Sequence, residues 1–143
     1  MVMFTTYNTV RMYDTDTAQI LFFGAQFRFI NDALEELLAT IGLNMNILFT
    51  EKDYGFVVRH ASSDYIKPSR VGDKLRIEIH VVHIGDTSFG FLYNIYNDKT
   101  NELVGKSKSV HVTIDVKTKK KISIPNALRQ SLEEHLVSED QIR

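Results

Sequence analysis

The sequence contains no cysteine among its 143 residues. A disulfide scaffold, a thiol nucleophile and a cysteine-based zinc site are therefore all excluded. Proline is also scarce, with only Pro68 and Pro125, and no stretch rich in proline, glycine or serine interrupts the chain. We therefore expect residues 1–143 to form one domain, which is long enough to bury a core without a metal or a disulfide.

The sequence also lacks an excess of either charge and any long apolar run. Seventeen basic residues face 18 acidic ones, for a formal charge of −1, so we expect no nucleic-acid partner. The longest apolar run, residues 20–25, is too short to span a bilayer. Residues 1–14 lack the charged start and apolar stretch of a secretory signal. These absences predict a soluble cytoplasmic protein.

Alternating apolar and polar residues predict strands in the second half of the chain. Residues 74–84 have the two-residue period of a strand that is buried on one face. Short polar turns at 85–86 and 97–101 favour an antiparallel meander. The other expected strands of the same sheet are residues 3–12, 56–66, 87–97 and 109–117.

Residues 25–44 have a different period, because apolar residues recur at intervals of three and four. This spacing predicts an amphipathic helix of about five turns. Its apolar stripe is Phe27, Ile30, Leu34, Leu37, Leu38 and Ile41. Gly42 stands where a helix C-cap is expected. A shorter helix is expected to begin near Pro125, with Leu128, Leu132 and Leu136 along one side.

The predicted elements indicate an α+β fold. One long helix and one curved antiparallel sheet can bury each other's apolar faces if the sheet wraps around the helix. Such a sheet keeps an exposed edge, which favours pairing of two copies.

Two carboxylates, Asp14 and Asp16, lie between the first predicted strand and the long helix. The free N–H groups at a helix N-terminus can bind an oxyanion. Phe22 and Phe23 are placed to line a dry pocket beside it, and Phe27 follows one turn later. On the residues alone, a simple polar turn is the stronger interpretation, since Asp and Thr are common turn formers.

Residues 13–16 (Tyr-Asp-Thr-Asp), followed by residues 20–23 (Ile-Leu-Phe-Phe), resemble the signature of the 4-hydroxybenzoyl-CoA thioesterase family of hot-dog-fold proteins. Three further blocks resemble the family in the same order, and the likeness spans roughly residues 8–135. These blocks are residues 65–81, 85–97 and 110–115, the last with Ile124-Pro125 behind it.

This resemblance implies a hot-dog fold and hydrolysis of an acyl-CoA thioester to a free acid and CoA. By position, Asp16 is the catalytic carboxylate, and the backbone N–H of Phe23 binds the oxyanion. We expect Phe22 and Phe27 to contact the substrate. The resemblance also implies a homodimer or homotetramer with the site at the subunit interface. We expect neither a cofactor nor a metal.

Two positions depart from the family pattern. Gln19 stands where glycine is common, and Gln26 stands where an aromatic residue is common. A catalytically silent hot-dog module that binds acyl-CoA or a partner protein is therefore an alternative. A hot-dog hydratase is a weaker one, because its motif contains a histidine and none lies in or near residues 13–27.

The expected chemistry needs few groups. An alkyl thiol has a pKa of about 8.5 and leaves as a thiolate without much help from an acid. One carboxylate and one oxyanion site can therefore suffice. Asp16 would either attack the acyl carbon or activate a water molecule. Both roles stay open here, as do aliphatic and aromatic acyl groups.

The remaining polar residues suggest no metal site. His80 and His83 are three apart on a predicted strand and should point to opposite faces. His60 and His111 are expected at the surface or at an interface. A basic run, Lys117 and Lys119 to Lys121, either contacts the CoA phosphates or forms a solvated turn.

Overall fold

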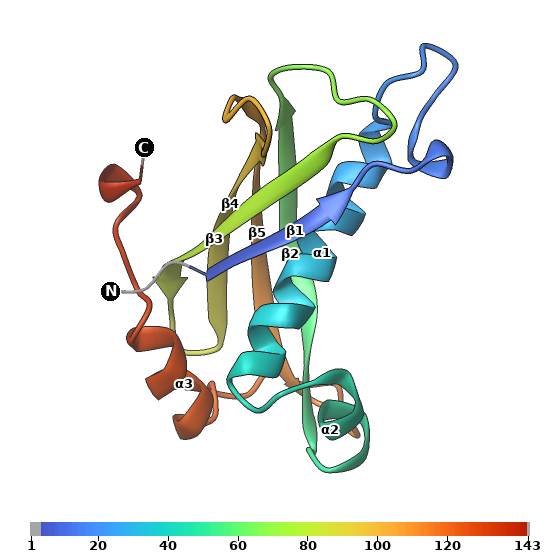
Figure 1. The fold of residues 1–143 in the computed structure, drawn as a ribbon. Helices are drawn as coiled ribbons and strands as arrows, with labels where there is room; N and C mark the ends of the chain where they lie inside the picture. The colour runs from blue at the N-terminus through green and yellow to red at the C-terminus, as the bar shows by residue number, and fades with distance from the viewer. Residues whose placement is uncertain (1–3, 143) are drawn as a thin grey trace.

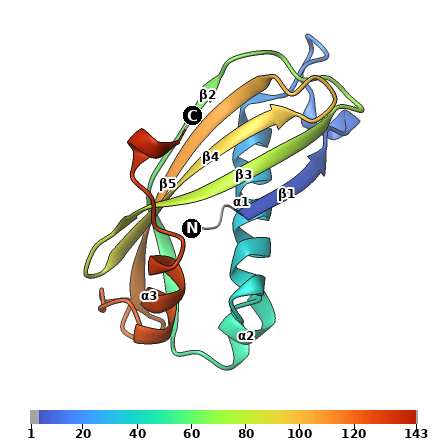
Figure 2. The same ribbon diagram turned by 60° about the vertical axis from the view of Figure 1, so that its left-hand side comes forward.

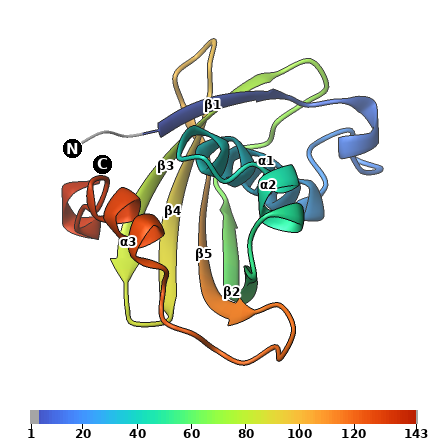
Figure 3. The same cartoon turned by 90° about the horizontal axis from the view of Figure 1, so that it is seen from below.

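A five-stranded antiparallel sheet curves around one long helix in the computed structural model, which describes residues 4–142 (Figure 1). The strand order is β1-β3-β4-β5-β2. Figure 3 shows α1 inside the curve of the sheet, and Figure 2 shows the strands crossing it obliquely. The elements are β1 (Phe4–Thr9), α1 (Phe23–Thr40), α2 (Met45–Thr50), β2 (Tyr54–Tyr65), β3 (Lys74–Ile84), β4 (Ser88–Asn97), β5 (Leu103–Asp115) and α3 (Asn126–Glu133).

Helix α1 occupies most of the predicted 25–44 segment, beginning two residues earlier and ending at Thr40. Gly42 follows the C-cap with a φ of 85°, a conformation that favours glycine. Its N–H donates to the carbonyl of Ala39, and the N–H of Leu43 donates to Leu38. These paired bonds form a Schellman motif, so the predicted stop at Gly42 is confirmed.

The apolar stripe of α1 packs against the concave face of the sheet. Leu34, Leu37 and Leu38 are all buried, and Ile41 packs partly buried beside them. The facing side chains come from alternate positions of β3 and β4, as a two-residue period requires. They are Leu75, Ile77, Ile79, Phe91, Tyr93 and Ile95. The predicted wrapping of the sheet around the helix is confirmed.

Strand β3 has the bounds that its alternation predicts, whereas β5 begins at Leu103 instead of residue 109. The early part of β5 carries Gly105 and Ser107 on its inward side, where the helix approaches closely. Small residues there remove the apolar alternation by which a strand is recognised. β5 also ends two residues before the predicted 117.

The other differences lie at element ends. β1 spans only Phe4–Thr9 of the predicted 3–12, and Met3 lies outside the described residues. β2 begins two residues earlier than the predicted strand 56–66 and ends one residue earlier. α3 ends before Leu136, which forms a parallel bridge with Val81 of β3. Helix α2 was not expected from the sequence, because six residues are too few to show a helical period.

The burial of the helix stripe predicts a large effect of Leu38→Ala on stability. Leu38 is 3% exposed, and truncation of a buried leucine costs about 2–5 kcal/mol of unfolding free energy. Urea unfolding of the two proteins measures the difference. Ala39 is exposed, so Ala39→Gln should stay within about 0.5 kcal/mol. Equal stability of Leu38→Ala and the parent would contradict this packing.

Candidate active site

Asp14 is the buried member of the carboxylate pair, at 2% exposure. One carboxylate oxygen forms an ion pair with Arg28 of α1 at 2.7 Å, and the other accepts the N–H of Arg11 at 2.8 Å. The same interaction raises the pKa of Arg28. Asp14 therefore ties the loop after β1 to the first turns of α1, which agrees with a structural role.

Asp16 lies in a tight exposed turn above the helix. Its Oδ1 accepts the N–H of Ala18 at 2.8 Å, and its backbone N–H donates to the carbonyl of Ile20 at 3.0 Å. Gln19 in this turn has a φ of 66°, in the left-handed region that glycine occupies without strain. The family preference for glycine at this position thus has a backbone cause, and Gln19 adopts the same conformation.

The loop after β1 leads into the N-terminus of α1. The N–H of Phe22, the N-cap residue, donates to the carbonyl of Asp14 at 2.7 Å, and Leu21 donates to Ser69 at 2.8 Å. No side chain caps this end of α1. Phe23 is the first helical residue, so its N–H has no carbonyl one turn before it to bond.

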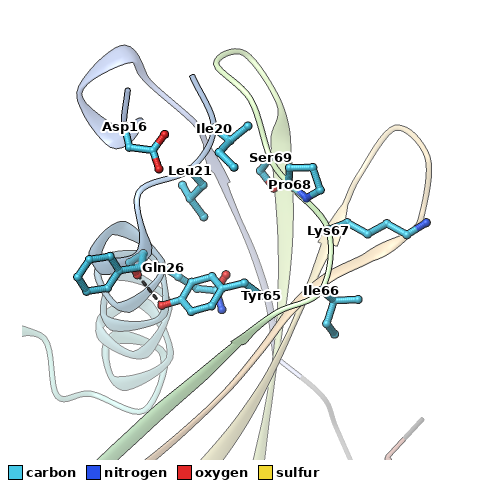
Figure 4. A pocket seen from close by; sticks show the side chains of 10 residues that line it. Asp16, Ile20, Leu21, Gln26, Tyr65, Ile66, Lys67, Pro68 and Ser69 are labelled. Atoms are coloured by element: carbon cyan, nitrogen blue, oxygen red, sulfur yellow. Dashed lines mark hydrogen bonds between the residues drawn. The ribbon is translucent and has the colours of Figure 1, made fainter. Parts of the chain in front are cut away.

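Asp16 and Phe23 line the same cleft of about 380 Å³, which we call the Asp16 cleft. One wall is the loop and the start of α1, and the other is the end of β2 with the segment after it (Figure 4). Tyr65 spans the two walls, because its hydroxyl donates to the carbonyl of Phe23 at 2.7 Å. The other lining residues include Ile20, Leu21, Gln26, Ile66, Lys67 and Pro68.

Gln26 borders this cleft and is 2% exposed. Its Nε2 donates to the carbonyl of Asp64 at 3.1 Å and to Oγ of Ser107 at 3.4 Å. A Cβ at Gly105 would lie 2.6 Å from Oε1 of Gln26. Glycine at 105 therefore lets the buried amide stand where an aromatic residue is common in the family.

The structure brings together two of the four predicted site residues. Phe22 is 43% exposed, packs against Phe23 with ring centroids 4.5 Å apart and planes tilted by 45°, and does not line the Asp16 cleft. Phe27 lines a neighbouring hollow instead. No pattern in the sequence singles out Tyr65, although it opens one of the family-like blocks. Its role is visible only once β2 is placed beside α1.

Two further hollows lie along the side of α1 that faces β2, and because they share lining residues we call them together the helix groove. The first, of about 210 Å³, is lined by Phe27 and Ala61, and the second, of about 790 Å³, extends to Leu38 and Phe56. From one hollow to the next, the lining residues come from later positions of α1 and from earlier positions of β2. The hollows therefore follow one another in space.

A chain of three buried polar side chains lines the 210 Å³ hollow. The hydroxyls of Tyr93 and Ser109 are 2.7 Å apart, and Oγ of Ser109 is 2.9 Å from Nε2 of His111. We call these residues the hydroxyl relay. Burial lowers the pKa of His111 to about 4 and raises that of Tyr93. All three groups are therefore uncharged at neutral pH.

The other polar candidates lie elsewhere. His60 and His83 border a hollow on the outer face of the sheet, with Arg59. The basic run after β5, Lys117 and Lys119 to Lys121, is exposed. Within residues 4–142, no three His, Asp or Glu side chains are grouped to hold a metal ion, and no helix has the length and apolarity to cross a bilayer.

Solved structures share this architecture. A 1,4-dihydroxy-2-naphthoyl-CoA thioesterase from Synechocystis superposes with a TM-score of 0.86, at 23% identity over 93% of this chain and 97% of that one. A gentisyl-coenzyme A thioesterase gives a TM-score of 0.80, at 20% identity over 90% and 98% of the two chains. The fold is therefore the hot-dog fold of acyl-CoA thioesterases, as the sequence predicted.

Sequence comparison gives the family. The thioesterase-like superfamily profile matches residues 10–132, and the chain belongs to that superfamily. The 1,4-dihydroxy-2-naphthoyl-CoA hydrolase of Nostoc punctiforme is 35% identical over 129 residues, which cover 90% of this chain and 86% of that protein. The hydrolase of the same name from Crocosphaera subtropica is 29% identical over 129 residues, or 89% and 94%. The predicted thioester hydrolase class is confirmed.

The buried neutral His111 predicts a pH-dependent stability. In the unfolded chain, His111 has an ordinary pKa near 6.5 and binds a proton below that pH. In the folded chain, the same side chain binds a proton only near pH 4. Unfolding free energy should therefore fall as the pH falls from about 6.5 to 4, by about 3 kcal/mol from this group. Urea unfolding at several pH values measures the slope.

His111→Phe should flatten this slope, because it removes the group that titrates. His83→Phe, on the outer face, should keep it. The same slope in His111→Phe as in the parent would contradict the assignment.

Proposed function

We propose that this enzyme hydrolyses CoA thioesters of hydroxylated aromatic acids and that Asp16 is its catalytic carboxylate. The observation that carries the proposal is that Asp16 and Phe23, the first residue of α1 with a free N–H, line the same cleft. Thioester hydrolysis can proceed with two protein groups that act on the substrate carbonyl, a carboxylate and an oxyanion donor.

The reaction follows from these two groups. Asp16 either attacks the acyl carbon, forming an anhydride that water later opens, or takes a proton from a water molecule that attacks. In both routes a carbon–oxygen bond forms, the carbon–sulfur bond breaks and CoA leaves as a thiolate. The N–H of Phe23 stabilises the oxyanion formed on the way, and one such donor is typically worth about 3 kcal/mol.

The substrate class rests on the relatives and on the lining of the cleft. The relatives carry the names 1,4-dihydroxy-2-naphthoyl-CoA hydrolase and gentisyl-coenzyme A thioesterase, and both acyl groups are dihydroxylated aromatic rings. In this chain, the apolar residues Ile20, Leu21 and Ile66 line the cleft. Such walls favour a flat apolar ring over water.

The assembly is the second part of the proposal. β2 forms one edge of the sheet along 12 residues. Val57 and Val58 on this strand are 45% and 63% exposed. A long edge strand with exposed apolar residues favours pairing with another strand. We therefore propose a homodimer, or a homotetramer built from it, and a cytoplasmic location.

Asp16→Asn should lower kcat by about 10²–10⁴ while the protein stays folded. The amide keeps the shape of the side chain but neither attacks nor accepts a proton at neutral pH. Free thiol released from 1,4-dihydroxy-2-naphthoyl-CoA measures the turnover. Full turnover by Asp16→Asn would overturn the catalytic assignment. Binding without any turnover in the parent enzyme would favour the silent module.

Asp14→Asn is the matched control for that variant. It weakens a buried ion pair, so it should lower the unfolding free energy by about 1–3 kcal/mol and leave most turnover per folded molecule. Losses of turnover as large as those of Asp16→Asn would mean that the two carboxylates act together.

Sedimentation at micromolar concentration tests the assembly, and we expect a dimer or tetramer. Val57→Lys puts a charge on the β2 edge and should shift the enzyme toward monomer. Tyr7→Lys places the same charge on β1, at the opposite edge, where Tyr7 is 50% exposed, and should not. A parent protein that sediments as a stable monomer would remove the proposed interface.

A further inference from the structure

Gln26 closes the Asp16 cleft on the side of the helix groove. Its side chain extends from α1 to the carbonyl of Asp64 on β2 and to Oγ of Ser107 on β5. Figure 4 shows it running from α1 toward the strands, beside Tyr65. The Asp16 cleft and the two hollows of the helix groove share no lining residue. A ligand that fills the cleft therefore ends against Gln26 and does not continue into the groove.

The partners of the Gln26 amide fix its orientation. A backbone carbonyl only accepts hydrogen bonds, so the amide atom that faces the carbonyl of Asp64 at 3.1 Å is the donor Nε2. Oγ of Ser107 lies 3.4 Å from the same nitrogen, and it is itself 2.6 Å from Oγ of Ser63. Both hydrogen bonds of the side chain therefore use Nε2, and Oε1 occupies the other corner of the amide.

Oε1 of Gln26 is an acceptor that a ligand can reach. Within residues 4–142 no group donates a hydrogen bond to it. The polar side-chain atoms that are both sealed and unpartnered belong to other residues, His80, Asn94 and Thr113, so Oε1 keeps contact with open space. Because Gln26 lines the Asp16 cleft, a ligand in that cleft can donate to Oε1.

The surroundings of this acceptor make its partner important. Ile20, Leu21 and Ile66 give the cleft apolar walls, and a ring that packs against them displaces water. An acceptor that loses water and gains no donor is costly. A ring that carries a hydroxyl group at this end restores the hydrogen bond, whereas a plain ring does not.

The acyl group, and not CoA, takes the end of the cleft at Gln26. CoA is long and carries phosphates, so it has to extend from the cleft into solvent. Gln26 is 2% exposed, which marks the buried end. Gln26 also follows Phe23 by three residues, less than one turn of helix, and both residues line the cleft. A ring whose thioester carbonyl bonds to the N–H of Phe23 is therefore close to the amide.

We propose that Oε1 of Gln26 accepts a hydrogen bond from a hydroxyl group on the aromatic ring of the substrate and so selects hydroxylated acyl groups. This inference rests on the proposed function and assigns the residue that distinguishes its substrates. Ser107 and the carbonyl of Asp64 hold the amide in the orientation that turns Oε1 to the ligand. A group that is held before the ligand arrives loses less entropy on binding.

The hydroxyl group that Gln26 recognises is the one distal to the thioester. A hydroxyl on the ring carbon next to the acyl group lies within hydrogen-bond distance of the thioester carbonyl of the same molecule and donates to it. The 4-hydroxyl of a 1,4-dihydroxy-2-naphthoyl group is too far from that carbonyl to do so. Its O–H is therefore available to the acceptor in the cleft.

Two substrates that differ by one hydroxyl group test the inference. They are 1,4-dihydroxy-2-naphthoyl-CoA and 1-hydroxy-2-naphthoyl-CoA, which lacks the distal hydroxyl. The parent enzyme should prefer the first in kcat/KM by at least about tenfold, because a site built for a hydroxyl rejects an analogue without it. Gln26→Met keeps the length of the side chain and replaces the amide by a weak acceptor, so it should reduce this ratio to near one.

Ser63→Ala is the matched control. It removes a hydroxyl from the same buried polar group, since Ser63 bonds to Ser107, but it leaves the amide of Gln26 intact and should keep the parent ratio. A loss of stability alone lowers turnover of both substrates equally, so the ratio separates recognition from folding. If Gln26→Met does not fold, as judged by circular dichroism, a crystal structure of the parent with 1,4-dihydroxy-2-naphthoate decides. We expect its 4-hydroxyl oxygen within about 3 Å of Oε1.

The outcomes separate the two proposals. If the parent enzyme hydrolyses neither substrate, the proposed function is wrong for this acyl class, and the inference falls with it. If the parent hydrolyses both without preference, or if the preference survives in Gln26→Met, the proposed function stands and the inference is overturned. A 4-hydroxyl bound to other groups in the crystal structure would overturn it in the same way.

Discussion

The packing of α1 into the concave face of the sheet is the contact on which the site depends. A buried leucine stripe fixes the helix along its length, and the ion pair of Asp14 with Arg28 ties the preceding loop to its first turns. The free N–H of Phe23 is therefore held in one place relative to the end of β2. An oxyanion donor contributes most when it is already oriented before the reaction.

The same packing divides the concave face into two regions. Along β3 and the facing side of β4, large apolar side chains fill the space under the helix. Along β5 the inward positions are instead Gly105, Ser107, Ser109 and His111. Small and polar residues leave room there for the amide of Gln26 and for the helix groove. The fold is thus packed tightly on one side of α1 and open on the side of β2.

Local periodicity predicted the parts of the fold that repeat along the chain. The stripe of α1, the stop at Gly42 and the alternation of β3 all follow from residues close in sequence, and the structure agrees with them. The first half of β5 was not predicted, because its inward residues are small where the helix approaches. Helix α2, six residues long, carries no periodic signal.

The site was partly predictable for the same reason. Asp16 and Phe23 lie on one continuous segment, and the family resemblance aligns that segment directly. Tyr65 reaches the Asp16 cleft, and His111 the helix groove, only through strand pairing between distant parts of the chain, as in the pairing of β2 with β5. His111 was expected at the surface or an interface, and the surface placement is wrong, because the side chain is 7% exposed on the inner face of the sheet. A single sequence carries no local pattern for such contacts.

A crystal structure of the Asp16→Asn enzyme with bound 1,4-dihydroxy-2-naphthoyl-CoA would test the central claim most directly. We expect the thioester carbonyl oxygen within about 3 Å of the backbone nitrogen of Phe23, with the acyl carbon facing residue 16. A thioester bound away from the N-terminus of α1, with its carbonyl oxygen held by other donors, would contradict the account.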